Sequence, residues 1–255
     1  MSARITARLA FALALLLAGG AVVARAASLP PGFVYLRDID PTIVQNMRYA
    51  GARNFVGRPI AGYEAPECVL TAKAAQALKI VQAGLAGRQL SLIVWDCYRP
   101  ARAVADFWRW SQDAADTKMR AEFYPRIDKG RLFALGYIAR SSGHSRGSTV
   151  DLGIMPAGRA VPPYDPAAPL QPCHAGAGER ADEGAVDLGT GYDCMDALAA
   201  TDHPAVGKAA RDNRRLLRAL MTGAGFAPYA KEWWHFQLVN EPFAGKAFDF
   251  LITGH

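Results

Sequence analysis

The sequence lacks several short motifs by which zinc proteins are commonly recognised. It has no C-x-x-C pair, which argues against a zinc-thiolate site, and no H-E-x-x-H, which excludes the helical zinc motif of many metalloproteases. An H-x-H pair is also absent, and the chain holds only 5 histidines in 255 residues. Any metal site must therefore combine residues that lie far apart in the sequence.

An apolar run long enough to cross a membrane is missing as well. A span needs about 20 apolar residues, whereas the run Leu9 to Ala18 is shorter. It follows the basic residues Arg4 and Arg8 and precedes Ala24-Arg25-Ala26, a small-x-small cleavage site. We therefore predict a secretory signal peptide at 1–26, a single mature domain at 27–255 and a periplasmic location. A retained N-terminal anchor is the alternative, and no membrane span is expected after signal removal.

A strong charge of either sign is also lacking. The formal net charge is +6, and loss of the three arginines in the predicted signal peptide lowers it to +3. No basic stripe is present, so we expect no nucleic-acid partner. No repeat or coiled-coil heptad is visible, and the sequence leaves the oligomeric state open.

Cysteine is scarce but even in number, which in an exported protein favours two disulfides. Three pairings are possible. We favour Cys68 with Cys97 and Cys173 with Cys194, because the second pair brackets one polar segment rich in glycine and proline. The competing interpretation of the four cysteines is a zinc-thiolate site.

Apolar patterning predicts helices that alternate with strands without a regular βαβ period, so the expected class is α+β with a small mixed or antiparallel sheet and flanking helices. Residues 28–67 and 156–191 are rich in proline and glycine, and we expect the second stretch to be a long insertion pinned by a disulfide. The arginines of the last helix, Arg214 among them, should face solvent. Helices are expected at Thr71–Leu85, Ala101–Ser111 and Val206–Gly223, and strands at Leu90–Trp95, Thr149–Ile154 and Trp233–Val239.

Two separated motifs contain the candidate metal ligands. S-S-G-H-S-R-G-S-T-V-D-L-G holds His144 and Asp151, and E-W-W-H-F holds Glu232 and His235. Two imidazoles and one carboxylate can bind a catalytic zinc ion and leave a fourth position for water. A second acid must take the proton of that water, and Glu232 is the candidate. A histidine packed among aromatic side chains is the plainer alternative for His235.

The spacing of the second motif sets a geometric condition. Residues three apart on a regular strand point to opposite faces. Glu232 and His235 can share a cleft only if Glu232 precedes the strand or if a bulge re-aims it. We expect the adjacent tryptophans to exclude water and to raise the pKa of the Glu232 carboxyl.

Taken together, the motifs resemble the D-alanyl-D-alanine dipeptidases, zinc peptidases related to the bacterial D,D-carboxypeptidases. The matches extend from about Tyr49 to Phe250. They are Y-A-G-A-R-N-F-V-G at Tyr49, G-Y-E at Gly62, W-D-C-Y-R-P at Trp95, S-x-H-S-R-G-S-x-x-D-L at Ser142, G-T-G-Y-D-C-M-D at Gly189, E-W-W-H-F at Glu232, and E-P-F with F-D-F near the end.

The resemblance implies a cleft of the hedgehog and D,D-peptidase type and one Zn2+ per chain. It implies that His144, Asp151 and His235 bind the ion and that Glu232 is the general base and acid.

The resemblance also gives roles to four other side chains. It implies that Arg99 stabilises the developing oxyanion, for which a guanidinium is chemically suited. It implies that Tyr49 and Asp193 hold the substrate ammonium group and that Ser142 lies at the substrate pocket. The structural alternatives are a salt bridge at the Pro100 turn for Arg99, a turn cap for Asp193 and a hydrogen bond within the loop for Ser142.

The expected function is hydrolysis of D-alanyl-D-alanine, or a related small dipeptide, in the cell envelope, where it would recycle cell-wall D-alanine. The long 156–191 segment leaves strict D-Ala-D-Ala preference open. One alternative is a zinc D,D-carboxypeptidase that trims peptidoglycan stem peptides. The other is a zinc-binding domain without catalytic activity.

Overall fold

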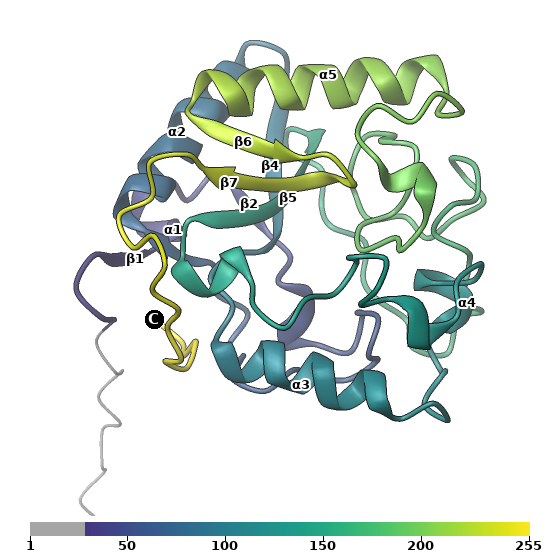
Figure 1. Cartoon of the computed structure of the whole chain (residues 1–255). Helices are drawn as coiled ribbons and strands as arrows, with labels where there is room; N and C mark the ends of the chain where they lie inside the picture. Colours follow the sequence, from purple (N-terminus) through teal and green to yellow (C-terminus); the bar gives the residue numbers. More distant parts are fainter. Residues whose placement is uncertain (1–28) are drawn as a thin grey trace, which may run out of the picture.

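A five-stranded mixed sheet forms the centre of the protein in this computed structural model, which describes residues 29–255 (Figure 1). The strand order is β2-β4-β5-β7-β6; β2 and β4 are parallel, and the other neighbours are antiparallel. A separate antiparallel pair joins β1 to β3. The strands are β1 Phe33–Tyr35, β2 Val44–Gln45, β3 Val69–Thr71, β4 Leu90–Asp96, β5 Thr149–Pro156, β6 Phe226–Tyr229 and β7 Glu232–Leu238.

Helices lie on two sides of the molecule, and of these α2 and α5 pack on the five-stranded sheet. Figure 1 shows α2 and α5 close together at one side of the sheet and α3 at the opposite side of the molecule. One apolar core lies between the sheet, α2 and α5, and a second gathers around α3 and the C-terminal tail. The α-helices are α1 Leu36–Ile39, α2 Ala72–Ala86, α3 Ala101–Gln112, α4 Arg120–Phe123 and α5 Lys208–Gly223. Short 3-10 helices are η1 Arg48–Ala50, η2 Lys129–Arg131, η3 Gly143–Arg146 and η4 Ala197–Ala199.

This arrangement confirms the α+β class. Each predicted helix and strand is present with ends that differ by at most two residues. Thr71, expected as the first residue of a helix, instead caps α2, because its hydroxyl accepts a hydrogen bond from the amide of Ala74 at 3.3 Å. Within residues 29–255, no helix is both long and apolar enough to span a membrane. The predicted signal peptide lies outside the described residues.

One prediction about α5 is wrong. Arg214 does not face solvent but is buried, with 3% of its surface exposed. Its guanidinium donates hydrogen bonds to the carbonyl oxygens of Leu188 at 2.7 Å, Ala200 at 2.7 Å and Leu198 at 2.9 Å. These three acceptors offset the cost of burying the charge. The apolar periodicity of the helix could not reveal them, because they lie 14 to 26 residues earlier in the chain, outside the helix.

The long segment after β5 contains no helix or strand between 157 and 191. It is held instead by isolated hydrogen bonds, such as that from the Val186 amide to Ile154 O at 2.9 Å, and by the disulfide between Cys173 and Cys194. A second disulfide joins Cys68 to Cys97 at the end of β4. Both bonds match the pairing expected from the sequence.

Candidate functional site

The three candidate metal ligands come together at the centre of the sheet. Asp151 on β5 and His235 on β7 are register partners on adjacent strands, and His144 lies in η3 just before β5. His235 Nδ1 lies 3.0 Å from Asp151 Oδ1, and His144 Nε2 lies 3.3 Å from the same oxygen and 3.3 Å from His235 Nδ1. Residues 91 positions apart in sequence thus present their donor atoms to one point.

The chemistry of this donor set fits a metal ion. His144 Nδ1 lies 2.7 Å from the carbonyl oxygen of Cys97, which can only accept a hydrogen bond, so the ring proton is on Nδ1 and the Nε2 lone pair faces the other two ligands. Asp151 Oδ1 is buried and has no hydrogen-bond partner among the described residues. Zinc ligands at tetrahedral corners stand about 3.3 Å apart, close to the separations seen here. The three side chains can therefore hold a zinc-sized cation.

The charge state of Asp151 also suits a metal ligand. Burial opposes its ionisation, but the neighbouring imidazoles of His144 and His235 outweigh burial and hold its pKa well below the usual range. Its second oxygen accepts a hydrogen bond from the hydroxyl of Tyr192 at 3.1 Å and lies 3.7 Å from the Arg99 guanidinium. Asp151 is therefore ionised, and the contacts to its second oxygen hold the carboxylate in place while Oδ1 faces the two histidines.

Glu232 stands beside the triad because β7 is irregular at its start. The register of β6 and β7 shifts between Pro228 and Tyr229: Pro228 pairs with Phe236 and Tyr229 with Glu232, so one step along β6 corresponds to four steps along β7. This bulge places Glu232 Oε2 3.6 Å from His235 Nδ1 on the same side of the strand. Burial, followed by the charge of Asp151, raises the pKa of Glu232 to about 8. The geometric condition set by the sequence is met by the bulge.

The tryptophans next to Glu232 belong to the apolar core. Trp233 and Trp234 are buried in the apolar core, and neither lines the cavity. Trp233 Nε1 donates a hydrogen bond to Thr190 Oγ1 at 2.8 Å, and Trp234 packs edge-on against Tyr192. Both tryptophans anchor β7 in the core, and burial raises the pKa of Glu232 in the expected direction.

Arg99 lines the cavity that contains the three candidate ligands, and a salt bridge holds its guanidinium in place. Its Nε and terminal nitrogen lie 2.9 Å and 2.8 Å from Asp96 Oδ2, and its guanidinium lies over the ring of Tyr49 at 5.2 Å. Asp96 is fully buried and accepts a further hydrogen bond from Tyr63 at 2.6 Å. The salt bridge considered as the alternative role of Arg99 is therefore present, and it fixes a guanidinium that still faces the cavity.

The remaining predicted residues, Tyr49, Asp193 and Ser142, lie around this cavity, which has a volume of about 290 Å3. The Tyr49 hydroxyl donates to Asp193 Oδ2 at 2.7 Å. Burial, and then the charge of Asp151, raises the pKa of Asp193 well above its ordinary value. The Ser142 hydroxyl accepts a hydrogen bond from the amide of His144 at 3.2 Å, which is the loop contact considered as its alternative role.

Several residues of the site were missed from the sequence. Asp96 holds Arg99 in place, and Tyr192 holds Asp151. Both lie in motifs matched in the sequence, Asp96 next to Cys97 and Tyr192 next to Asp193. Tyr137, Ile138 and Tyr229 also line the cavity. No motif marks these three, because they come from an irregular segment and from a short strand that was not predicted.

Comparison with known proteins gives consistent matches over most of the chain. A family model described as D-ala-D-ala dipeptidase matches residues 30–161 and 178–253, with a break inside the 157–191 segment. A protein from Streptomyces coelicolor named D-alanyl-D-alanine dipeptidase is 38% identical over 221 residues, covering 87% of this chain and 98% of its own length. Proteins of the same name from Enterococcus faecalis and Escherichia coli K12 are 33% and 32% identical, covering 87% and 80% of this chain and 98% and 83% of their own lengths.

These matches, with the site described above, make the protein a metallopeptidase. Within that class, the chain belongs to the D-ala-D-ala dipeptidase family.

Proposed function

We propose that the protein is a zinc-dependent dipeptidase that hydrolyses D-alanyl-D-alanine to two molecules of D-alanine. The observation that carries this proposal is the convergence of His144 Nε2, Asp151 Oδ1 and His235 Nδ1 on one point, with Glu232 3.6 Å from His235. The names of the relatives supply the substrate. The cavity of about 290 Å3 is at the small end of ligand pockets, as a dipeptide requires.

In this proposal His144, Asp151 and His235 hold one Zn2+ ion. A bound zinc ion supplies Lewis acidity, which strengthens water as an acid and polarises a peptide carbonyl. The hydrogen bond from His144 Nδ1 to Cys97 O and the bond from Tyr192 to Asp151 keep two of the ligands oriented.

Glu232 would move the proton of the reaction. As a carboxylate it takes a proton from the attacking water, whose oxygen bonds to the peptide carbon, and it then delivers the proton to the leaving nitrogen as the C–N bond breaks. Without a metal ion, burial and then the charge of Asp151 raise the pKa of Glu232 to about 8; a cation held beside it would lower this pKa and favour the carboxylate that accepts the proton. Arg99, fixed by Asp96, would donate to the carbonyl oxygen as negative charge develops on it.

Asp193 and Tyr49 would bind the ammonium group of the substrate. Their hydrogen-bonded pair is buried at the cavity wall. The ammonium group of the substrate would lower the raised pKa of Asp193 and pair with its carboxylate. A carboxypeptidase acting on long stem peptides has no use for this anion, because the nitrogen at that position is acylated. The pair therefore favours a dipeptidase over the carboxypeptidase alternative.

We further propose a periplasmic location and a role in recycling cell-wall D-alanine, for which the basis is the signal-like sequence of residues 1–26. A deletion strain grown on D-Ala-D-Ala as its sole nitrogen source tests this role. Growth should be lost and should return on complementation, whereas undiminished growth would remove the support.

A substrate panel tests the reaction itself. The purified zinc-loaded protein should hydrolyse D-Ala-D-Ala far faster than L-Ala-L-Ala or N-acetyl-D-Ala-D-Ala. A preference for the acetylated substrate would favour the carboxypeptidase. Full zinc content with no turnover of any peptide would favour the non-catalytic domain.

A further inference from the structure

We propose that Glu183 is a positioning residue for the amine end of the substrate, an inference that rests on the proposed function. Glu183 lies in the irregular 157–191 segment, outside the motifs that define the metal site. Its side chain is 11% exposed. It does not line the catalytic cavity, and it acts through the Tyr49–Asp193 pair.

The carboxylate of Glu183 bridges the two chain segments that carry this pair. Its Oε1 accepts a hydrogen bond from the guanidinium of Arg48 at 2.7 Å, and its Oε2 accepts one from the backbone amide of Tyr192 at 2.8 Å. Arg48 directly precedes Tyr49, and Tyr192 directly precedes Asp193. One side chain therefore fixes the separation of the two backbones whose side chains meet at 2.7 Å.

Arg48 depends on this contact. Its side chain is 1% exposed, and its Nε and second terminal nitrogen have no hydrogen-bond partner among the described residues. Glu183 is thus the main group that compensates a buried guanidinium. Without it the guanidinium must move toward water or toward another carboxylate, because an unpaired buried charge is strongly unfavourable. Tyr49, the next residue along the short helix η1, would move with it.

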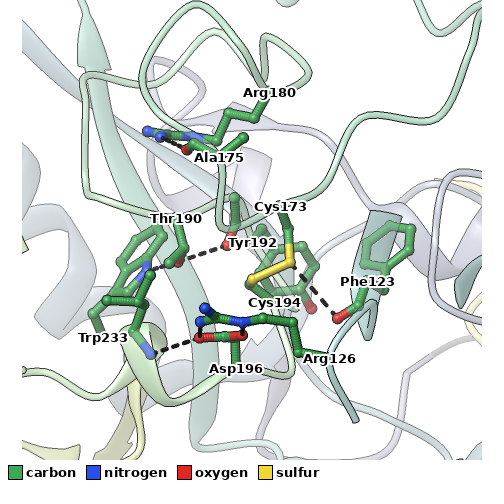
Figure 2. Close-up of a disulfide and its surroundings, with 12 residues drawn as sticks. Phe123, Arg126, Cys173, Ala175, Arg180, Thr190, Tyr192, Cys194, Asp196 and Trp233 are labelled. Carbon is green, nitrogen blue, oxygen red and sulfur yellow. Dashed lines mark hydrogen bonds and ion pairs between the residues drawn. A yellow bond between two sulfur atoms is a disulfide. The ribbon is translucent and has the colours of Figure 1, made fainter. Parts of the chain in front are cut away.

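The backbone on either side of Asp193 is held in place. Asp193 has φ +57°, a left-handed conformation that is uncommon for non-glycine residues, although aspartate tolerates it better than most. Glu183 accepts a hydrogen bond from the amide of Tyr192, the residue before Asp193, and the Cys173–Cys194 disulfide holds Cys194, the residue after it. Figure 2 shows this disulfide beside Tyr192, with the Cys173 sulfur 3.7 Å from the carbonyl oxygen of Phe123. The disulfide fixes one side of Asp193 and Glu183 the other.

Loss of the Glu183 carboxylate should therefore weaken recognition of the substrate amine and leave the chemical step intact. For Glu183→Ala we expect the KM for D-Ala-D-Ala to rise at least tenfold, with kcat and zinc content changed less than threefold. Propionyl-D-alanine, which has the same shape but no amine, should keep its inhibition constant within twofold. Glu179→Ala removes an exposed carboxylate from the same segment and should leave all four values unchanged.

A second variant and a second background test whether the rise in KM comes from a general loss of structure. Glu183→Gln keeps the volume, but its single acceptor oxygen cannot serve both donors, so KM should still rise at least fivefold. In a Tyr49→Phe background, where the pair is already broken, Glu183→Ala should raise KM less than threefold.

The results separate this inference from the proposed function. If the wild-type protein does not hydrolyse D-Ala-D-Ala, the proposed function fails and the inference falls with it. If the wild type is active, the inference alone is overturned by any of three results. These are a KM within twofold of wild type in either Glu183 variant, an equal weakening of propionyl-D-alanine, and a full effect in the Tyr49→Phe background.

Discussion

Replacement of Glu232 by glutamine should separate catalysis, metal binding and stability in a single variant. Glutamine has nearly the same volume and stays neutral at every pH. It removes the proton carrier of the proposed mechanism and also removes a carboxyl group that is costly to ionise where it lies. The structure therefore predicts two effects: kcat should fall, and the unfolding free energy near neutral pH should rise.

The catalytic effect follows from the position of Glu232 beside the ligand His235. A positioned general base and acid commonly contributes 10²–10⁴-fold to rate, or about 3–5 kcal/mol. We expect kcat for D-Ala-D-Ala to fall by about that factor in Glu232→Gln. Zinc should be retained, because the proposed ligands do not include Glu232.

The effect on stability follows from the pKa. In protein stripped of metal, burial and then the charge of Asp151 raise the pKa of Glu232 from 4.5 to about 8. A carboxyl group whose pKa is raised by folding contributes fully to stability below pH 4.5, and this contribution is lost as the pH rises toward 8. At about 1.4 kcal/mol per pH unit, the loss at pH 7 is about 3 kcal/mol. Glutamine does not titrate, so the stripped variant should exceed the stripped wild type in unfolding free energy by roughly 2–3 kcal/mol at pH 7, and the gain should nearly vanish at pH 4.5.

Urea denaturation with a chelator present, at pH 4.5 and pH 7, measures this difference. Glu179→Gln, which removes an exposed carboxylate, is the matched control and should show no such pH-dependent gain. Two outcomes would refute the reasoning: a kcat within tenfold of wild type, or equal stability of the Glu232 variant and wild type at both pH values.

Three further changes test other parts of the site. His144→Ala should lose both bound zinc and activity; equal zinc loss in Glu232→Gln, by elemental analysis, would show that the role of Glu232 is misassigned. Arg99→Lys should lower kcat by about 10²–10³, because an ammonium cannot reproduce the planar donor set of a guanidinium; steady-state rates near those of wild type would argue against an oxyanion contact. The double change Cys173→Ser and Cys194→Ser, which opens a disulfide with a sequence separation of 21, should reduce the urea-derived unfolding free energy by about 3 kcal/mol, and a reduction below about 1 kcal/mol would mean that this bond adds little.

Much of the regular structure could be predicted because apolar periodicity is local. The helix after Thr71 and the strand at Leu90–Asp96 each bury a continuous apolar face, and both occur close to the expected bounds. β6 was missed because it has four residues, three of them exposed, and contains a proline. Arg214 was assigned to the surface because its three carbonyl partners come from a segment without periodicity.

The functional site likewise combines residues that local motifs predict with contacts that only the fold creates. His144, Asp151 and His235 were found because two motifs contain the residue types that zinc requires, and the sheet brings them into contact. Glu232 shares their cleft because of a bulge in β7. A bulge was one of the two arrangements that the sequence analysis allowed. The contact between Glu183 and the residues next to Tyr49 and Asp193 joins positions 135 residues apart, and no local pattern announces it.

Zinc reconstitution tests the central claim most directly. Activity toward D-Ala-D-Ala should disappear when the purified protein is treated with a chelator and should return in proportion to added zinc, levelling off at one equivalent per chain. Activity that survives complete removal of metal, or that does not return with zinc, would contradict the account.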